Sequence, residues 1–128
     1  MGVAINTKID TFTNNGFINS PGSGQWNNGI WISSNATIEK LVNNGTIKGG
    51  HSAIMVTSQH IKTVENTGII HAEGEWGSSI LLEYGGFIEH IINTGTISSN
   101  NVGIGSAYGV FGTLTIKDGG MVYGKYSA

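Results

Sequence analysis

A motif of ten residues occurs four times along this chain, and its internal spacing is the same in every copy. Each copy begins with Ile, has Asn five residues later, Gly two residues after the Asn, and a closing Ile two residues after the Gly. The copies begin at Ile9, Ile38, Ile61 and Ile88, and a degenerate fifth copy is expected near Leu114. Only the number of residues between one copy and the next varies.

A fixed block followed by a variable remainder is typical of a solenoid, in which equivalent residues of successive coils stack in columns and insertions form loops. The repeat therefore predicts an all-β fold, a right-handed parallel β-helix (β-solenoid) of about five coils, because parallel crossover connections are nearly always right-handed. We expect residues 1–128 to form a single β-helix domain. The composition fits this fold, since 21 of the 128 residues are Gly and only 11% are charged, and Gly, Asn and β-branched residues suit short strands joined by tight turns.

Each coil is predicted to have three strands. The first surrounds the leading Ile, the second carries the closing Ile, and the Asn-x-Gly between them is predicted to be a tight turn in which Gly has a positive φ. The third strand is predicted at an apolar cluster of each coil, namely Ile30-Trp31-Ile32, Ile54-Met55-Val56, Ile80-Leu81-Leu82 and Tyr108-Gly109-Val110.

The Asn residues of the motif are predicted to form a structural column at the turn. Stacked Asn amides can hydrogen-bond to one another and to backbone groups of the turn. Amide oxygens rarely hold a cation without carboxylates, so we do not expect this column to bind a metal. It comprises Asn14, Asn43, Asn66 and Asn93, with Asp118 as its expected fifth member.

The units at residues 43–47, Asn-Asn-Gly-Thr-Ile, and 93–97, Asn-Thr-Gly-Thr-Ile, resemble repeats of pertactin-like passenger domains of Gram-negative autotransporters. The resemblance covers residues 5 to about 122, and a similar pattern occurs in haemagglutinin-like secreted exoproteins and phage tailspikes. It implies a right-handed β-helix that is exported to the cell surface and serves adhesion, autoaggregation or toxin delivery. Because no signal peptide is visible at the start of the sequence, it implies a fragment of a longer secreted or surface-exposed bacterial protein.

Charge and residue types argue against several other classes of function. The net charge is −2 and the six Lys are scattered, with no Arg, so we expect no nucleic-acid partner. No apolar run is long enough for a membrane span, so no membrane insertion is expected. The chain has no Cys, and its four His occupy different offsets in the repeats, so we expect no metal site and no cofactor.

Catalysis is not expected either. Pectate-lyase-like β-helices, which look similar in sequence pattern, typically use Asp-bound calcium and an Arg or Lys base. This chain has only Asp10 and Asp118 as Asp residues, at opposite ends of the sequence. We therefore expect that the protein is not an enzyme.

Trp26 and Trp76 are the candidate ligand contacts. They lie in the two long inserts, residues 20–26 and 71–76, which leave the same corner of the coil after a closing Ile. Two coils apart, they could form one aromatic lobe for contact with a sugar or a protein. The alternative is that each Trp folds back over a face of the solenoid.

These observations favour a non-catalytic structural and adhesive module, with a host-cell or glycan surface as its partner. Two other functions stay open: a carbohydrate-binding or carbohydrate-active β-helix that uses the Trp-bearing inserts, and an engineered self-assembling solenoid scaffold. Open strand edges invite pairing, so we also expect self-association into an oligomer through the ends of the solenoid.

Overall fold

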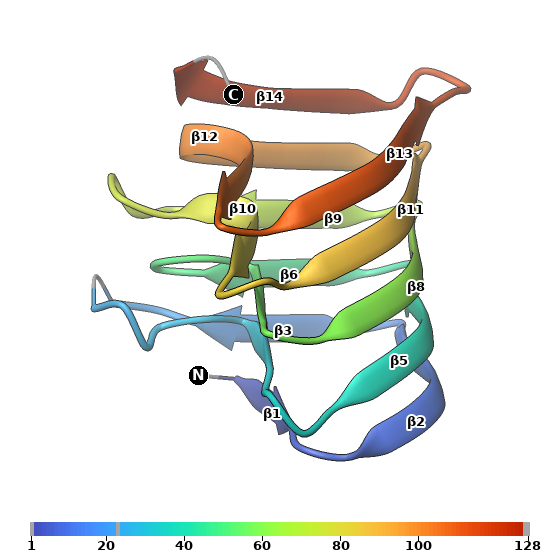
Figure 1. Cartoon of the computed structure of the whole chain (residues 1–128). Coiled ribbons are helices and arrows are strands. Elements are labelled where there is room, and N and C mark those ends of the chain that lie inside the picture. The colour runs from blue at the N-terminus through green and yellow to red at the C-terminus, as the bar shows by residue number, and fades with distance from the viewer. Residues whose placement is uncertain (1, 23, 127–128) are drawn as a thin grey trace.

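The computed structural model describes residues 2–22 and 24–126. This part of the chain forms fourteen strands and no helix, and the strands stack as a parallel β-solenoid of about five turns (Figure 1). In Figure 1 the near strands run from left to right and the far strands return from right to left as the chain rises from its N-terminus, so the winding is right-handed. The fold class predicted from the repeat is therefore confirmed.

Three faces surround the interior. The first is a sheet of β2 (Lys8–Asn14), β5 (Thr37–Asn43), β8 (His60–Asn66), β11 (Phe87–Asn93) and β13 (Val110–Ile116). The second contains β3 (Phe17–Ser20), β6 (Thr46–Gly49), β9 (Ile69–Ala72), the start of β12 (Thr96–Ala107) and β14 (Met121–Tyr126). The third contains β1 (Val3–Ile5), β4 (Ile30–Ile32), β7 (Ile54–Thr57), β10 (Ser78–Glu83) and the end of β12.

The motif sets the register of the coils. On the first face each leading Ile is the partner of the next, from Ile9 through Ile38 and Ile61 to Ile88. On the second face the closing Ile residues pair in the same way. Because side chains alternate between the two sides of a strand, this register turns a whole column of Ile inward in each face.

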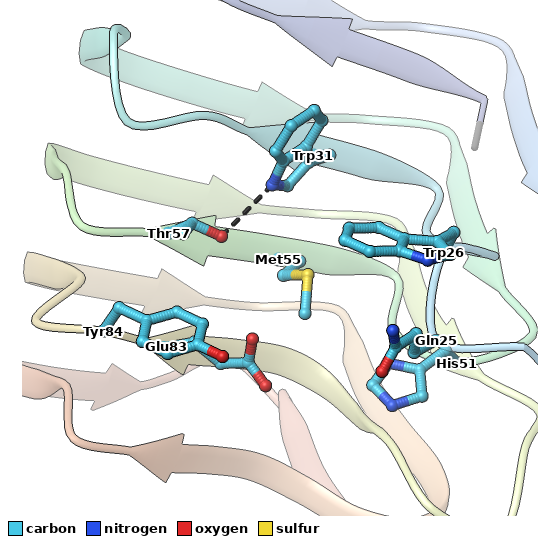
Figure 2. Close-up of a pocket in the computed structure, with 8 residues that line it drawn as sticks. All are labelled: Gln25, Trp26, Trp31, His51, Met55, Thr57, Glu83 and Tyr84. Carbon is cyan, nitrogen blue, oxygen red and sulfur yellow. Dashed lines mark hydrogen bonds between the residues drawn. The ribbon is translucent and has the colours of Figure 1, made fainter.

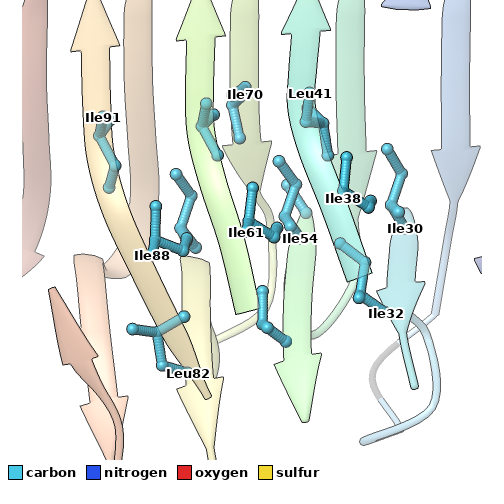
Figure 3. Packing of buried hydrophobic residues seen from close by; sticks show 14 of the residues in the cluster. Ile30, Ile32, Ile38, Leu41, Ile54, Ile61, Ile70, Leu82, Ile88 and Ile91 are labelled. Atoms are coloured by element: carbon cyan, nitrogen blue, oxygen red, sulfur yellow. The ribbon is translucent and has the colours of Figure 1, made fainter. Parts of the chain in front are cut away.

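The interior is filled almost entirely by these aliphatic columns. Side chains of the three faces meet in one cluster, seen from close by in Figure 3, in which Ile38, Ile54, Ile61 and Ile88 are almost completely buried. Burying one such side chain stabilises a fold by about 1.5–3 kcal/mol relative to leaving it exposed. The stacked Ile columns are therefore the main source of stability, and they hold the outer surface rigid.

The motif glycines are needed for a reason other than the one predicted. Positive φ angles occur at Gly22, Gly85 and Gly119 among the described glycines, and at none of the motif glycines. Instead, a Cβ added at Gly45 would overlap the carbonyl oxygen of Gly16 in the coil below, and Gly68 and Gly95 are crowded in the same way. The prediction of a positive φ was wrong, because close stacking of the turns is what excludes a side chain here.

The third strand lies where it was predicted in three coils and elsewhere in the fourth. Ile30–Ile32, Ile54–Thr57 and Ser78–Glu83 form β4, β7 and β10. In the next coil the partner of Ile80 is Ile104, and Tyr108 lies in the following turn with a φ of 67°. The fourth coil has no corner insert, so β12 continues from the second face directly into the third.

The fifth coil begins earlier than predicted. Phe111 is the partner of Ile88 and so takes the place of a leading Ile, whereas Leu114 is the partner of Ile91. Leu114 therefore lies three positions into the coil and does not begin it.

Candidate ligand-binding site

The four Asn residues lie one above another at the corner between the first and second faces. Asn14 donates from Nδ2 to Oδ1 of Asn43 over 2.9 Å, Asn43 donates to Asn66 over 2.9 Å, and Asn66 donates to Asn93 over 2.8 Å. Each Nδ2 also reaches the carbonyl oxygen of the motif Gly two residues later. The side chains are buried and their hydrogen-bonding groups face each other, so the column ties the coils together and presents nothing to a ligand.

Asp118 is not the fifth member of this column. The residue in register with Asn93 is Ile116, and the Nδ2 of Asn93 donates to the carbonyl oxygen of Met121. Asp118 lies in the turn that follows, with a φ of 53°. This last turn is longer than the others, so a residue placed by similarity of sequence falls outside the register.

Trp26 and Trp76 do not form one aromatic lobe. Their inserts do stack along the corner between the second and third faces. A Cβ added at Gly50 would meet the backbone of Gly22, and one added at Gly74 would meet the backbone of Gly50. However, Trp26 lines a hollow on the third face, whereas Trp76 lies beside Asn100, Asn101 and Lys125 in a separate one. Of the first insert, Ser23 lies outside the described residues.

The hollow at Trp26 is a concave site on the third face. It has a volume of about 280 Å³ and is lined by Gln25, Trp26, Trp31, His51, Met55, Thr57, Glu83 and Tyr84 (Figure 2). We call it the aromatic hollow. It crosses three coils, because β4, β7 and β10 each contribute lining residues.

The strand pattern explains how the aromatic hollow arises. Trp31 is in register with Met55, and Met55 with Leu81, as the middle residues of the three apolar clusters. Their neighbours on each side point into the core, so these side chains point outward. The insert that carries Trp26 partly covers these outward-facing residues. Met55 is therefore only 5% exposed and forms the floor of the hollow.

The two indole rings of the aromatic hollow are held in a fixed arrangement. The Trp31 Nε1–H donates to the Thr57 hydroxyl oxygen over 3.1 Å, which anchors that ring on the neighbouring coil. Trp26 packs edge-on against Trp31, with ring centroids 6.4 Å apart and planes at 72°. Trp26 remains 59% exposed, so it covers part of the face, as one alternative expected, and still presents much of its ring.

The charge of the aromatic hollow is carried by Glu83. Its carboxylate makes no hydrogen bond or ion pair with another described residue, and its electrostatic neighbour is His51. Burial lowers the pKa of His51 below its ordinary value of 6.5, and Glu83 partly opposes this by raising it. His51 is therefore mostly neutral at pH 7, and the hollow carries a negative charge.

A buried amide lies just behind the aromatic hollow. Asn28 donates from Nδ2 to the carbonyl oxygen of Gln25 over 3.2 Å and lies 3.3 Å from the sulfur of Met55. Its Oδ1 has no hydrogen-bond partner among the described residues. Asn28 thus connects the insert that carries Trp26 to the floor of the hollow.

The sequence pointed to only part of this site. Trp26 is predicted as a contact because it lies in an insert. Trp31 and Met55 are predicted only as members of the third strand, and Glu83 is in no predicted element or site. Strand alternation was the available signal, because a large apolar residue between two core Ile residues must point outward.

The second Trp lies in a more polar setting. Trp76 is 83% exposed, and Glu75, Asn100, Asn101 and Lys125 line a hollow of about 320 Å³ beside it.

Across residues 2–22 and 24–126, no group of three His, Asp or Glu side chains is arranged to hold a metal ion. The same residues contain no helix that could cross a membrane.

No protein-family model matches the chain, and neither the curated proteins nor the solved structures include a significant match to it.

Proposed function

We propose that the chain is a non-catalytic structural and adhesive module of a secreted bacterial surface protein, comparable to a piece of an autotransporter passenger domain. Its contact with a surface ligand is made through the aromatic hollow. The observation that carries this proposal is the pair Trp26 and Trp31, two large rings held over an exposed face by a rigid stack of coils. Exposed aromatic side chains on a rigid scaffold are typical of binding surfaces.

The chemistry of the aromatic hollow supports binding over catalysis. Hydrolysis of a glycosidic bond usually needs two carboxyl groups on opposite sides of the bond. The lining of the hollow includes one carboxyl group, that of Glu83, and one imidazole, that of His51. These two groups suit hydrogen bonding and charge complementarity with a ligand.

Binding of the fluorescently labelled chain to cultured epithelial cells, measured by flow cytometry, tests the adhesive role. Trp26→Ala should reduce binding by about tenfold, because an aromatic anchor of an interface typically contributes more than 1 kcal/mol. Phe17→Ala is the matched control, since Phe17 is a 64% exposed ring on β3 of the second face, and no residue of that face lines the hollow. Equal binding by the wild type and Trp26→Ala would show that the aromatic hollow does not make the contact with the cell surface.

Carbohydrate binding at Trp76 is a second candidate function. An exposed ring flanked by the amides of Asn100 and Asn101 can stack on a sugar and hydrogen-bond to its hydroxyl groups. A glycan array probed with the wild type and with Trp76→Ala tests it. Signals that disappear only in Trp76→Ala would support this candidate, and an array without signal would contradict it.

A further inference from the structure

We infer that the aromatic hollow binds a trimethylammonium group, the cationic head of choline or of a trimethylated lysine. The inference rests on the proposed function, because it names the ligand class of the same site. Its basis is the combination of three features in the hollow: two indole rings at a steep angle, a carboxylate without an ion pair among the described residues, and a lining without Lys or Arg.

The arrangement of the rings favours a rounded cation. Trp26 and Trp31 form two walls at 72° to each other, and Figure 2 shows Met55 between these rings and the side chains of Glu83 and Tyr84. A cation held within about 6 Å of a ring centroid is attracted by the negative face of the ring. The C–H face of a sugar ring, by contrast, stacks best on one open aromatic face.

The charge of the hollow also favours a cation as the ligand. Glu83 supplies a negative charge that no described residue neutralises by an ion pair, and its neighbour His51 is mostly uncharged at pH 7. Such a site attracts cations and repels anions. An organic cation can place its charge near Glu83 while its methyl groups contact the indole rings and the thioether of Met55.

The size of the hollow fits a head group better than a long ligand. Its volume of about 280 Å³ lies just below the range of small-molecule sites, roughly 300–1,000 Å³. The walls also need little rearrangement, because the Trp31 ring is already fixed by its hydrogen bond to Thr57. A site that is already formed loses less conformational entropy when it binds.

The test is a titration followed by the NMR signals of the three Trp indole N–H groups. The probes are choline, its uncharged carbon isostere 3,3-dimethyl-1-butanol, and methyl β-glucoside, all at matched ionic strength. Choline should shift the Trp26 and Trp31 signals and leave that of Trp76 in place, because Trp76 lines another hollow. The two uncharged probes should shift these signals far less.

Variants separate the contribution of charge from that of shape. Glu83→Gln keeps the size of the side chain and should weaken choline binding by about tenfold, and Trp26→Ala should have an effect of similar size. Glu75→Gln is the matched control, because it removes a carboxylate from the hollow at Trp76, and it should leave choline binding unchanged.

Several results would overturn the inference. Equal shifts by choline and its isostere, or unchanged choline binding by Glu83→Gln, would exclude recognition of the cation. If the glucoside alone shifts Trp26 and Trp31, the hollow is a ligand site of a different class, and the proposed function survives. If cell binding depends on Trp26 and no probe shifts its signal, the inference also fails while the adhesive role stands.

The same head group can come from two sources, which a further pair of probes distinguishes. Phosphocholine carries the head of a lipid or a modified glycan, whereas Nε-trimethyllysine carries that of a modified protein. Binding of either supports the inference. The phosphate of phosphocholine adds negative charge near Glu83, so we expect the lysine derivative to bind more tightly.

Discussion

Asn66 shows at the scale of one residue how neighbouring coils are joined. It is 1% exposed, accepts a hydrogen bond from Asn43 and donates one to Asn93. Its Nδ2 also lies within hydrogen-bonding distance of two backbone carbonyl oxygens, those of Gly68 and Thr96. A buried amide with this many partners cannot be removed without leaving polar groups unpaired.

Replacing Asn66 with Ala should therefore lower the free energy of unfolding by about 3 kcal/mol. Urea denaturation followed by circular dichroism measures this. Asn44→Ala is the control, because Asn44 makes a similar amide-to-amide bond with Asn15 on the exposed side of the turn. It should change stability by less than about 0.5 kcal/mol, and equal losses for both variants would contradict a special role of the buried column.

His71 provides a pH dependence at the same scale. Burial lowers its pKa, Lys48 lowers it further, and Glu73 and Ser98 raise it. Because the folded state binds a proton less readily than the unfolded state, this contribution to stability is complete above the ordinary value of 6.5 and is lost as the pH falls below it. The free energy of unfolding of the wild type should therefore decrease as the pH is lowered from 6.5 towards the pKa of His71 in the folded state.

The variant His71→Gln isolates this effect. Denaturant unfolding at a series of pH values should show a smaller decrease in stability between neutral and mildly acidic pH for the variant than for the wild type. Parallel curves for the two proteins would show that His71 titrates alike in the folded and unfolded states.

The residues of the Asn column could be predicted from the sequence because their spacing to Ile and Gly is the same in four copies. Asp118 could not be placed, because the last turn is longer and the similarity of Asp118-Gly119-Gly120 to the Asn-x-Gly of the motif suggested the wrong register. A periodic pattern determines a register only where the number of residues between columns is constant.

The turns carry the main constraint at the scale of an element. Successive Asn-x-Gly turns approach so closely that a Cβ on Gly45 would overlap the backbone of Gly16. Gly16 itself belongs to the first copy of the motif and has nothing within 4 Å of the corresponding position. The same residue type in the same motif therefore has a different importance in the first coil than in the second.

Gly45→Ala should lower the free energy of unfolding by at least about 3 kcal/mol, because the backbone of Gly16 in the coil below cannot move aside. Gly16→Ala should be neutral or slightly stabilising, since it restricts the unfolded chain without a clash. Thermal unfolding of the two variants compares them directly. A similar loss of stability in both would mean that the backbone conformation of the turn, and not the stacking, requires Gly.

Strand β12 shows what the sequence could not reveal at this scale. The apolar cluster of the third strand was visible in three coils because each lies between an insert and the next motif. In the fourth coil the chain runs from Thr96 to Ala107 without an insert, and Gly105 and Ser106 occupy the places of Leu81 and Leu82. Without apolar residues at these positions, the strand gave no signal in the sequence.

At the scale of the whole molecule, the aromatic hollow exists only because three coils are stacked. Its residues come from segments that are distant in the sequence, between Gln25 and Tyr84. The buried columns that stack the three coils could be predicted, because the residues at core positions repeat. The outward-facing residues that line the hollow could not, because they differ from coil to coil. The sequence therefore indicated the architecture more fully than the site.

The C-terminal end of the solenoid exposes apolar side chains. Leu114 and Ile116 on β13 are 45% and 48% exposed, whereas their partners in the coil below, Ile91 and Asn93, are buried. We propose that copies of the chain stack end to end, because edge strands pair readily with one another. Sedimentation across a concentration series should show a mass that rises with concentration.

Leu114→Lys should weaken this association by at least about tenfold, because a charge on the end of the stack opposes burial against another copy. Ile69→Lys is the control, since Ile69 is similarly exposed at 46% but lies on β9, which has a neighbouring strand on each side. A single mass that is independent of concentration in the wild type would contradict end-to-end stacking.

Successive coils stack in parallel register through the Asn column, and NMR of the Asn side-chain amides can detect this stacking in solution. We expect nuclear Overhauser contacts between the Nδ2 protons of Asn43 and those of Asn66, and between Asn66 and Asn93. We also expect these protons to exchange with solvent far more slowly than those of Asn44, which lies on the exposed side of the turn. Rapid exchange at Asn43 and Asn66, without contacts between them, would contradict the stacked register and with it the site built upon it.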